Sequence, residues 1–354
     1  MIGNWIEIIR TCNTSRVKDP KDTDFISRWL INTRVCVFSM TLLSALIGIV
    51  LAVPQIHSRP FPWGIALLVL LGLLLAHGSN NLVNDYFDVL NKVDTPGYPR
   101  TEYAPHPLLS GLTTVRNLWI AVVLFDLLDL AIAIYLTWLQ GWPIMAFAAT
   151  GLGLSVFYVA PPLKLKHHGL GEVAIFFIWG PLIIGGTVFA LTGKLDWPTL
   201  WATAPYGLAI VAVVLGKHLD KRKQDILRGV HTLPVILGER YGRYAMICTI
   251  CLFYIGVIVL SALKILPWTG LLALISLPKA WQVSKILRLP MPQTPVAAHK
   301  VSAPFIPKSL KEVFNPDGKD HFPLWPLWFV VWGVWWVRSA GAWLVLGLII
   351  GLFV

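Results

Sequence analysis

Long apolar runs alternate with short polar islands along this chain, and most runs approach the length of a membrane crossing. A helix needs about 20 mostly apolar residues to span a bilayer. The pattern therefore predicts roughly nine spanning helices, within a range of about eight to ten. The expected spans are Val35–Val53, Trp63–Val83, Leu118–Trp138, Pro143–Ala160, Val173–Leu191, Leu200–Leu215, Ala245–Leu263, Trp268–Trp281 and, after Arg338, Ser339–Val354.

The last apolar stretch, Phe322–Val354, is interrupted by Arg338. We expect its first half, rich in Trp and Pro, to be interfacial or a broken helix. Its second half, Ser339–Val354, is long enough for a short span.

Composition supports a membrane protein without a separate soluble domain. Of 354 residues, 56% are hydrophobic and only 13% are charged, and the mean hydropathy is +0.68. Soluble domains carry roughly 25% charged residues. We expect a single all-α domain, residues 1–354, folded as a polytopic helical bundle. Residues 1–34 are predicted to form a cytoplasmic N-terminal segment, and residues 282–322 a Pro-rich cytoplasmic loop.

Positive charge gathers in every second loop. One set of alternate loops holds 25 of the 29 Lys and Arg residues. Such asymmetry places the basic loops in the cytoplasm, so we expect an integral protein of the cell (inner) membrane. The net charge of +11 mainly reflects this topology, and nothing indicates nucleic acid as a partner. The basic loops are 1–34, 84–116, 163–171, 217–243 and 279–322.

The strongest candidate for chemistry is an acidic motif at the end of the second expected span. Asn84, Asp85 and Asp88 recur with His77 and Asn81 at three- and four-residue steps, so they share one helix face. Acids at this depth are costly and usually functional. Asp94 follows before a Thr-Pro-Gly turn, and we expect that loop to fold it back toward the other acids. Carboxylates in this arrangement suit Mg²⁺.

A second acidic island follows the sixth expected span, among Lys and Arg residues. Asp220 and Asp225 lie five residues apart, about 140° around an ideal helix. They share a face only if the helix ends, bulges or unwinds between them. The island is either a second metal site, in which Lys217 and Arg228 neutralise a diphosphate, or a basic loop with two incidental acids.

Two further acids, Asp126 and Asp129, lie within an apolar run and share one helix face. They either bond to another helix or line a cavity and bind a substrate. His106, in the loop after the first motif, is expected to be solvated.

At three blocks of residues the chain resembles the UbiA superfamily of intramembrane prenyltransferases. The match covers most of Val35–Leu263, and its middle block is most similar to the branch that prenylates dihydroxynaphthoate for menaquinone. The blocks are Asn84–Asp88 with Asp94, Thr95 and Pro107–Gly111; Tyr158–Lys166 with Gly169–Glu172; and Asp225 with Gly229, Thr232, Leu233 and Gly238.

The resemblance implies about nine helices around a central cavity open to the cytoplasmic side. It also implies Mg²⁺-bound polyprenyl diphosphate as donor, an aromatic small molecule as acceptor, and membrane lipid around the bundle. The implied catalytic residues are Asp85, Asp88, Asp225 and Lys166; the implied metal ligands are Asp85, Asp88, Asp94, Asp220 and Asp225. The implied diphosphate- and substrate-binding residues are Asn81, Asn84, Lys164, Lys217, Arg228, Tyr158 and Arg34.

The second motif departs from the family pattern of two acids four residues apart. When Asp225 is matched to the second acid, Lys221 occupies the place of the first, or Asp220 does if one residue bulges. Several alternatives stay open. The alternative acceptors are a hydroxybenzoate, a homogentisate-like ring, a chlorin and a glycerol phosphate, and a further alternative is a terpene cyclase of the same fold. Outside this class, Asp85, Asp88 and Asp126 would suit a cation-coupled transporter.

Overall fold

The computed structural model describes residues 2–11, 22–56, 60–302 and 325–354. Within these ranges the regular structure is helical apart from one isolated bridge between His168 and His231. Seven helical segments are long and apolar enough to cross a membrane. They are Val35–Gln55 (η2, α3 and η3), Trp63–Leu90 (α4), Val115–Gln140 (α6), Gly171–Thr192 (α8, η5 and α9), Trp197–Leu227 (α10), Leu233–Ala262 (α11) and Phe329–Ile350 (α15).

Two of the expected spans differ from the prediction. Pro143–Ala160 contains a shorter apolar helix, α7, at Pro143–Phe157. Trp268–Trp281 comprises the 3₁₀ segment η6, Trp268–Ser276, and the start of α12, Leu277–Leu287. In the described part of the chain, seven segments are therefore long and apolar enough to cross a membrane by themselves, whereas nine were expected.

The C-terminal stretch also differs from the prediction. Instead of a broken first half, α15 is one helix of 22 residues that passes through Arg338. Three Trp residues at or after its start are buried rather than interfacial: Trp328, Trp332 and Trp336 are each at most 2% exposed. The bundle core therefore takes up the aromatic side chains that the sequence suggested for a membrane interface.

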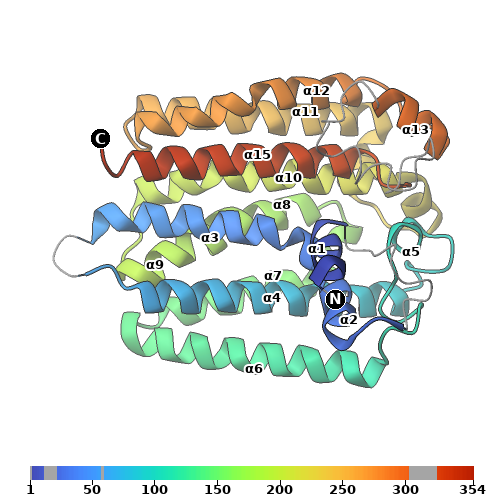
Figure 1. Cartoon of the computed structure of the whole chain (residues 1–354), viewed down its shortest axis with the longest axis horizontal. Coiled ribbons are helices and arrows are strands. Elements are labelled where there is room, and N and C mark those ends of the chain that lie inside the picture. Colours follow the sequence, from blue (N-terminus) through green and yellow to red (C-terminus); the bar gives the residue numbers. More distant parts are fainter. Residues whose placement is uncertain (1, 12–21, 57–59, 303–324) are drawn as a thin grey trace.

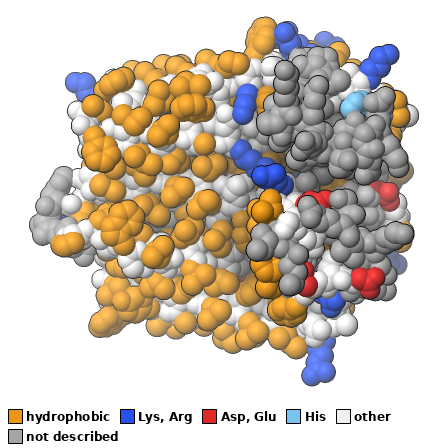
Figure 2. All heavy atoms as spheres, viewed as in Figure 1, with side chains coloured by type: hydrophobic (Ala, Val, Ile, Leu, Met, Phe, Trp, Pro, Cys, Tyr) orange, Lys and Arg blue, Asp and Glu red, His pale blue; other side chains and the backbone are white. Residues whose placement is uncertain are grey.

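The polar loops meet at one end of the bundle. Four short helices, α1 (Ile2–Thr11), α2 (Phe25–Asn32), α5 (Pro99–Tyr103) and α13 (Pro295–Ser302), lie at the right of Figure 1, opposite the C-terminus. Hydrophobic side chains cover most of the remaining face in Figure 2, while acidic side chains gather at the right. We call this right-hand end the polar end.

Both motif helices extend beyond their apolar segments into the polar end. Helix α4 continues through Asp85 and Asp88 to Leu90, and α10 continues through Asp220 and Asp225 to Leu227. The apolar side of α4's last turns packs on α6, where Leu82 and Val83 join a buried cluster. Tertiary packing therefore holds these polar turns helical, as propensity alone would not.

Close packing docks α15 against α10. A Cβ atom added at Gly216 would lie 2.9 Å from backbone atoms of Phe329 and Val330, so only glycine fits there. Asp220 accepts hydrogen bonds from the backbone N–H groups of Trp328, Phe329 and Val330, at 3.0, 2.7 and 3.0 Å. These amides begin α15 and would otherwise be unpaired.

A π-helical stretch interrupts the span formed by α8 and α9. This stretch, η5, covers Ile178–Gly185 and contains Pro181. Proline lacks the N–H that an α-helix needs, and the wider turn accommodates the missing bond. Residues on both sides of Pro181, among them Trp179 and Leu182, face the cavity described next.

Candidate active site

A cavity of about 1410 Å³ lies inside the bundle. Along α4 its wall extends from Asp88 to Val69, a rise of about 28 Å at 1.5 Å per residue. The end near Asp88 is polar, and the wall farther along is largely apolar. Polar-end lining residues include Arg34, Asn81, Asn84, Asp88, Asp94, Arg100, Tyr158, Lys217 and Lys221; apolar ones include Val69, Leu73, Ile132, Leu136, Ile144, Phe147 and Leu182.

The one-sided face predicted for α4 is present. Asn81, Asn84 and Asp88 are buried and line the cavity, and His77 lines it one turn farther along the helix. Asp85 is fully buried. The three- and four-residue spacing therefore placed all five side chains correctly on the inward face of the helix.

Two arginines neutralise Asp85. Arg34 forms an ion pair with Oδ1, and Arg100 Nη2 lies 3.1 Å from Oδ2. Arg34 is held at a positive φ of 54° between α2 and η2, a conformation that a non-glycine residue adopts at some cost, often at functional sites. Burial and the neighbouring Arg100 lower the pKa of Arg34 to about 10, so it stays charged at neutral pH.

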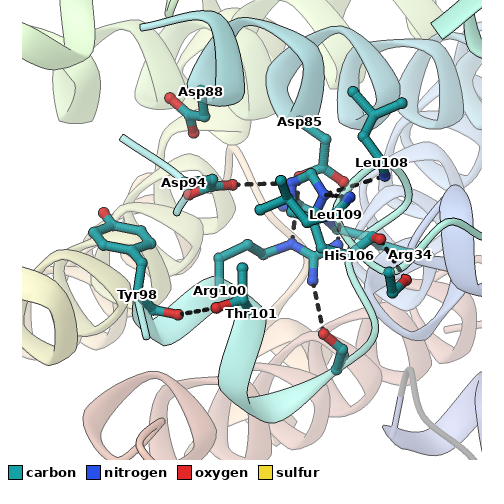
Figure 3. Close-up of polar contacts among 12 residues, drawn as sticks. Arg34, Asp85, Asp88, Asp94, Tyr98, Arg100, Thr101, His106, Leu108 and Leu109 are labelled. Atoms are coloured by element: carbon teal, nitrogen blue, oxygen red, sulfur yellow. Dashed lines mark hydrogen bonds and ion pairs between the residues drawn. The ribbon is translucent and has the colours of Figure 1, made fainter. Parts of the chain in front are cut away.

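The loop after α4 folds Asp94 back toward Asp85, as predicted. The backbone N–H groups of Val93 and Asp94 donate to the carbonyl oxygen of Asp88, at 2.8 and 3.0 Å. Figure 3 shows the Asp94 carboxylate beside the His106 ring. Burial would raise the pKa of Asp94, but the contact with His106 and the charges of Lys221 and Lys166 hold that pKa well below its usual range.

His106 is buried rather than solvated, contrary to the prediction. Only 1% of it is exposed, and its Nε2 lies 3.3 Å from Asp94 Oδ2 and 3.7 Å from Asp85 Oδ1. Its Nδ1 accepts from the backbone N–H groups of Leu108 and Leu109. Burial lowers the pKa of His106. A neutral ring that accepts at Nδ1 carries its proton on Nε2, which points at the two acids.

Asp88 pairs with Lys166 from the loop after α7. The Lys166 ammonium lies 2.8 Å from both carboxylate oxygens. Burial opposes the charge on Lys166, but the carboxylates of Asp88 and Asp225 outweigh it and raise the pKa of the lysine. The middle block thus contributes a cation directly to the first acidic motif.

Asp225 joins the second motif to the loop of the first. The Tyr98 hydroxyl donates to Asp225 Oδ1 at 2.6 Å. Arg228 and Lys221 lie over the Tyr98 ring, 4.7 and 5.0 Å from its centroid. Gly229, at a positive φ of 66°, turns the chain after α10, so that the Val230 N–H bonds back to the Asp225 carbonyl. Burial and Asp225 raise the pKa of Tyr98, which keeps its phenol a donor.

The remaining predicted substrate residues divide between the cavity wall and its surroundings. Asn81 donates to the Thr33 carbonyl at 2.8 Å. Lys217 lines the cavity and forms no hydrogen bond or ion pair with another described residue. Lys164 instead donates to Asn91 at 2.9 Å, and Arg228 donates to Thr95 at 2.7 Å. Neither of these two lines the cavity within the described part of the chain.

Asp220 is not brought together with the other acids. Helix α10 does not bulge between Asp220 and Asp225, so the two carboxylates diverge as the 140° estimate requires. Asp220 caps α15, and Lys221 is the next residue to line the cavity. The second motif therefore offers one acid, Asp225, and one lysine to the site.

The acids fit a divalent cation that prefers oxygen ligands. Asp85, Asp94 and His106 can each place one ligand atom within 4.8 Å of the others. Among the described residues, Oδ1 of Asp94, Oδ2 of Asp225 and Oδ1 of Asn84 are buried without a hydrogen-bond partner, and Oδ2 of Asp94 has only the contact with His106. Buried oxygens are normally satisfied, and unsatisfied carboxylate oxygens are ligands that Mg²⁺ uses.

Sequence reasoning missed two residues of this cluster, Tyr98 and Arg100. Tyr98 and Arg100 lie at and just after the start of α5, a helix of 5 residues that is too short for periodicity to mark a shared face. Arg100 carries one of only 3 basic charges between residues 84 and 116. Sequence reasoning also missed a buried chain in which His218 contacts Glu172 at 2.7 Å and Tyr158 at 3.2 Å. The signal that could have identified Tyr98 and Arg100 is the Tyr-Pro-Arg sequence, which directly follows the Thr-Pro-Gly turn and lies between the two acidic motifs.

For Asp126 and Asp129 the sequence left two alternatives open, a bond to another helix or a place in the cavity wall, and the structure shows both. Asp126 accepts from Ser79 of α4 at 2.7 Å, so it bonds to another helix. Both acids also line the apolar part of the cavity.

Comparison with known proteins places this site in a family. The profile of the UbiA prenyltransferase family matches residues 41–301. The 2-carboxy-1,4-naphthoquinone phytyltransferase of Synechocystis sp. is 27% identical over 57% of this chain and 64% of its own length, just under two thirds. The 1,4-dihydroxy-2-naphthoate octaprenyltransferase of Haemophilus influenzae is 26% identical over 60% of this chain and 70% of its own length.

Another relative is named for a different product, and a solved structure shares the fold. The digeranylgeranylglyceryl phosphate synthase of Natronomonas pharaonis is 31% identical over 48% of this chain and 56% of its own length. The structure of a UbiA homologue from Archaeoglobus fulgidus bound to GPP and Mg²⁺ superposes with a TM-score of 0.51 at 15% identity, covering 90% of this chain and 99% of that one. This structural likeness establishes the fold.

Proposed function

Because the chain belongs to the UbiA prenyltransferase family, we propose that it transfers a polyprenyl group from a prenyl diphosphate to an aromatic acceptor in quinone biosynthesis, with dihydroxynaphthoate of the menaquinone pathway as the leading candidate. The observation that carries this proposal is the mixed cluster at the polar end of the cavity. There, Asp85, Asp88, Asp94 and Asp225 lie among cations, next to an apolar channel.

The charge balance of the cluster suits a diphosphate. Six Lys and Arg side chains lie among or beside the four carboxylates, three of them in ion pairs with Asp85 and Asp88, and this excess of basic groups favours an anionic ligand. Guanidinium and ammonium donors form strong bonds to phosphate oxygens. The cations are Arg34, Arg100, Lys166, Lys217, Lys221 and Arg228.

We propose that Asp85, Asp88, Asp94 and Asp225 hold Mg²⁺, with Asp94 and Asp225 contributing their unpaired oxygens. When bound, Mg²⁺ would stabilise the negative charge of the departing diphosphate. One solved relative of this fold binds GPP with Mg²⁺. Asp220 is left out of this set because its oxygens already accept three backbone hydrogen bonds.

The protein's own residues would bind the donor, stabilise the positive charge that develops on it and exclude water. Arg34, Lys166 and Lys217 hold the diphosphate at the polar end, while the apolar wall holds the prenyl chain. The allylic carbon gains positive charge as its bond to the diphosphate oxygen breaks. Tyr158 lines the cavity near Lys166, and an aromatic face there would stabilise that charge by about 0.5–2 kcal/mol. The dry wall keeps water from the cation, so the electron-rich acceptor ring attacks it and then loses a proton.

The membrane arrangement is part of the proposal. We propose nine crossings, formed by the seven long segments together with α7 and the pair η6–α12. The polar end, with its basic loops, would face the cytoplasm, and the membrane would be the cell (inner) membrane. Prenyl diphosphate would enter from the cytoplasmic side with its tail in the lipid.

One alternative acceptor has a specific observation in its favour. The synthase of Natronomonas pharaonis named above acts, by its name, on a glyceryl phosphate, and it has the highest identity of the relatives described. A glycerol phosphate acceptor is therefore the second candidate.

The test is product formation by the purified protein in lipid nanodiscs. We expect geranylgeranyl diphosphate and 1,4-dihydroxy-2-naphthoate, with Mg²⁺, to yield a prenylated ring identified by mass spectrometry. Geranylgeranylglyceryl phosphate serves as the second acceptor. Asp85→Asn and Asp225→Asn should each lower the rate by roughly 100-fold or more, because charge stabilisation of a leaving group is worth several kcal/mol. If no product forms with either acceptor at a saturating Mg²⁺ concentration, the proposal is refuted.

A further inference from the structure

Arg338 is a charged residue near the middle of a spanning helix and outside the acidic cluster of the polar end. It lies nine residues after Phe329, the first residue of α15, so its Cα is about 14 Å along the helix, while its side chain reaches back to the residues that follow Arg34. Asp220 fixes the start of that helix beside α10. The family profile ends at residue 301, so α15 lies outside the region that it matches.

The hydrogen-bond partners of Arg338 are neutral. Its Nε donates to the Ser39 hydroxyl at 3.0 Å, and its Nη2 donates to the Cys36 carbonyl oxygen. Across the described ranges, no carboxylate lies within ion-pair distance of it. Arg34, Arg100 and Lys166 differ in this respect, since each faces an aspartate.

A guanidinium without a counter-ion in the middle of a membrane helix is costly, and such residues usually mark a binding site. Arg338 lines the cavity, and its Nη1 has no hydrogen-bond partner within the described part of the chain. Trp335, Val334 and Met40 line the same region. Aromatic and aliphatic walls beside an unpaired cation suit a flat, largely apolar molecule with one negative group.

The position of Arg338 also relates its surroundings to the polar-end cluster that we propose binds the diphosphate. Cys36 and Ser39, the partners of Arg338, follow Arg34 by two and five residues, and Arg34 binds Asp85. A molecule held at Arg338 would therefore lie about one helical turn deeper in the cavity than the cluster. That is the side on which the allylic carbon of a bound prenyl diphosphate would be found.

We propose that Arg338 binds the anionic substituent of the acceptor, and that it thereby orients the acceptor between α3 and α15. The substituent is a carboxylate on an aromatic ring or the phosphate of a glyceryl ether. This inference rests on the proposed function and deepens it, because it assigns acceptor specificity to a residue outside the diphosphate cluster.

The experiment compares acceptors that differ only in charge. The first pair is 1,4-dihydroxy-2-naphthoate and 1,4-naphthalenediol, which lacks the carboxylate; the second is geranylgeranylglyceryl phosphate and geranylgeranylglycerol. The kcat/KM ratio within each pair measures how strongly the site prefers the anion. The wild type should prefer the anionic member of one pair by roughly 10- to 100-fold, the worth of hydrogen bonds to a charged group.

Arg338→Gln should remove that preference, with the kcat/KM of the neutral acceptor and the KM of the prenyl diphosphate changed by less than about threefold. Ser39→Ala is the matched control, because it removes one neutral contact of Arg338 and keeps the charge. It should leave the preference intact. Arg338→Lys should retain part of it, since the charge remains but the planar fork is lost.

Two results would overturn the inference. One is a wild type that forms product without preferring the anion in either pair, which needs no variant to fold. The other is an equal loss for anionic and neutral acceptors in Arg338→Gln, as expected if the residue only ties α15 to α3. Failure of the wild type with all four acceptors would instead reject the proposed function itself.

Discussion

Three carboxylates at the polar end have strong partners of different kinds, whereas Asp94 has only a contact with His106, and this decides what each can do. Asp85 lies between two arginines, Asp88 faces Lys166, and Asp225 accepts from Tyr98. Asp94 Oδ1 is buried without a hydrogen-bond partner among the described residues. The carboxylate charges are thus compensated by neighbouring protein groups before any ligand binds. Incoming diphosphate and Mg²⁺ would therefore replace existing partners of these side chains.

Asp220 and Asp225 provide a direct residue-level prediction, because they lie on the same helix and have different partners. Asp220→Ala should lower the melting temperature, since the loss of a helix cap with several amide partners costs about 1–2 kcal/mol. It should leave the Mg²⁺ concentration for half-maximal activity unchanged. Asp225→Ala should raise that Mg²⁺ concentration and lower kcat. A thermal shift assay and a Mg²⁺ titration of pyrophosphate release measure both effects.

The reverse pattern, with Mg²⁺ dependence altered in Asp220→Ala and not in Asp225→Ala, would show that the metal ligands are wrongly assigned here.

Sequence spacing predicted the first motif well because its residues share one helix. The face that holds Asn81, Asn84, Asp85 and Asp88 follows from helical geometry alone. The role of Asp220 was not predictable in this way, since its partners are backbone amides more than 100 residues later in the chain. His106 and Tyr98 lie in loops, where tertiary contacts and not periodicity decide burial.

At the scale of elements, α10 and α15 form the packed centre on which the site depends. Small residues permit the close approach: Gly216 faces the backbone of α15, and Gly333 of α15 faces Val213. The same contact fixes the depth of Arg338 and the position of Lys217, which lies next to Gly216. Sequence periodicity identified both helices but not their contact, because a single apolar stripe does not reveal its partner.

Gly216→Ala tests this packing. The new Cβ would lie 2.9 Å from Phe329 and Val330 backbone atoms, which cannot rotate away, so overpacking should cost about 1–3 kcal/mol. We expect a lower melting temperature and reduced activity together. Gly153→Ala is the control, because nothing lies within 4 Å of its Cβ position. Alanine is also the better helix former, so the control should melt at the same temperature or higher. Equal melting of the two variants would contradict the packing argument.

Helix boundaries were the least predictable feature at this scale. Apolar run length ended the expected span at Val83, although the acidic motif predicted a helix through Asp88, and α4 continues to Leu90. Run length also divided the C-terminal stretch at Arg338, whereas α15 passes through it. In both cases an internal cavity and buried partners accept polar side chains that a rule based on lipid contact excludes.

For the whole molecule, the gathering of basic loops at one end predicts its orientation. Lys285 lies near the polar end, and Lys264 follows α11 at the opposite end; both are exposed. In a background without the 4 native cysteines, Lys264→Cys should react with a membrane-impermeant thiol reagent in intact cells. Lys285→Cys should react only after the membrane is opened. The opposite labelling pattern would place the polar end outside the cytoplasm.

The central claim is that the polar end binds a prenyl diphosphate through Mg²⁺ held by the acidic cluster. The most direct measurement is the affinity of the purified protein for geranylgeranyl thiodiphosphate, a slowly reacting donor analogue, with Mg²⁺ or with EDTA. We predict that Mg²⁺ tightens binding by at least about tenfold and that Asp94→Ala loses this gain, while Lys264→Gln keeps it. Equal affinity with and without Mg²⁺ in the wild type, or an undiminished gain in Asp94→Ala, would contradict the account.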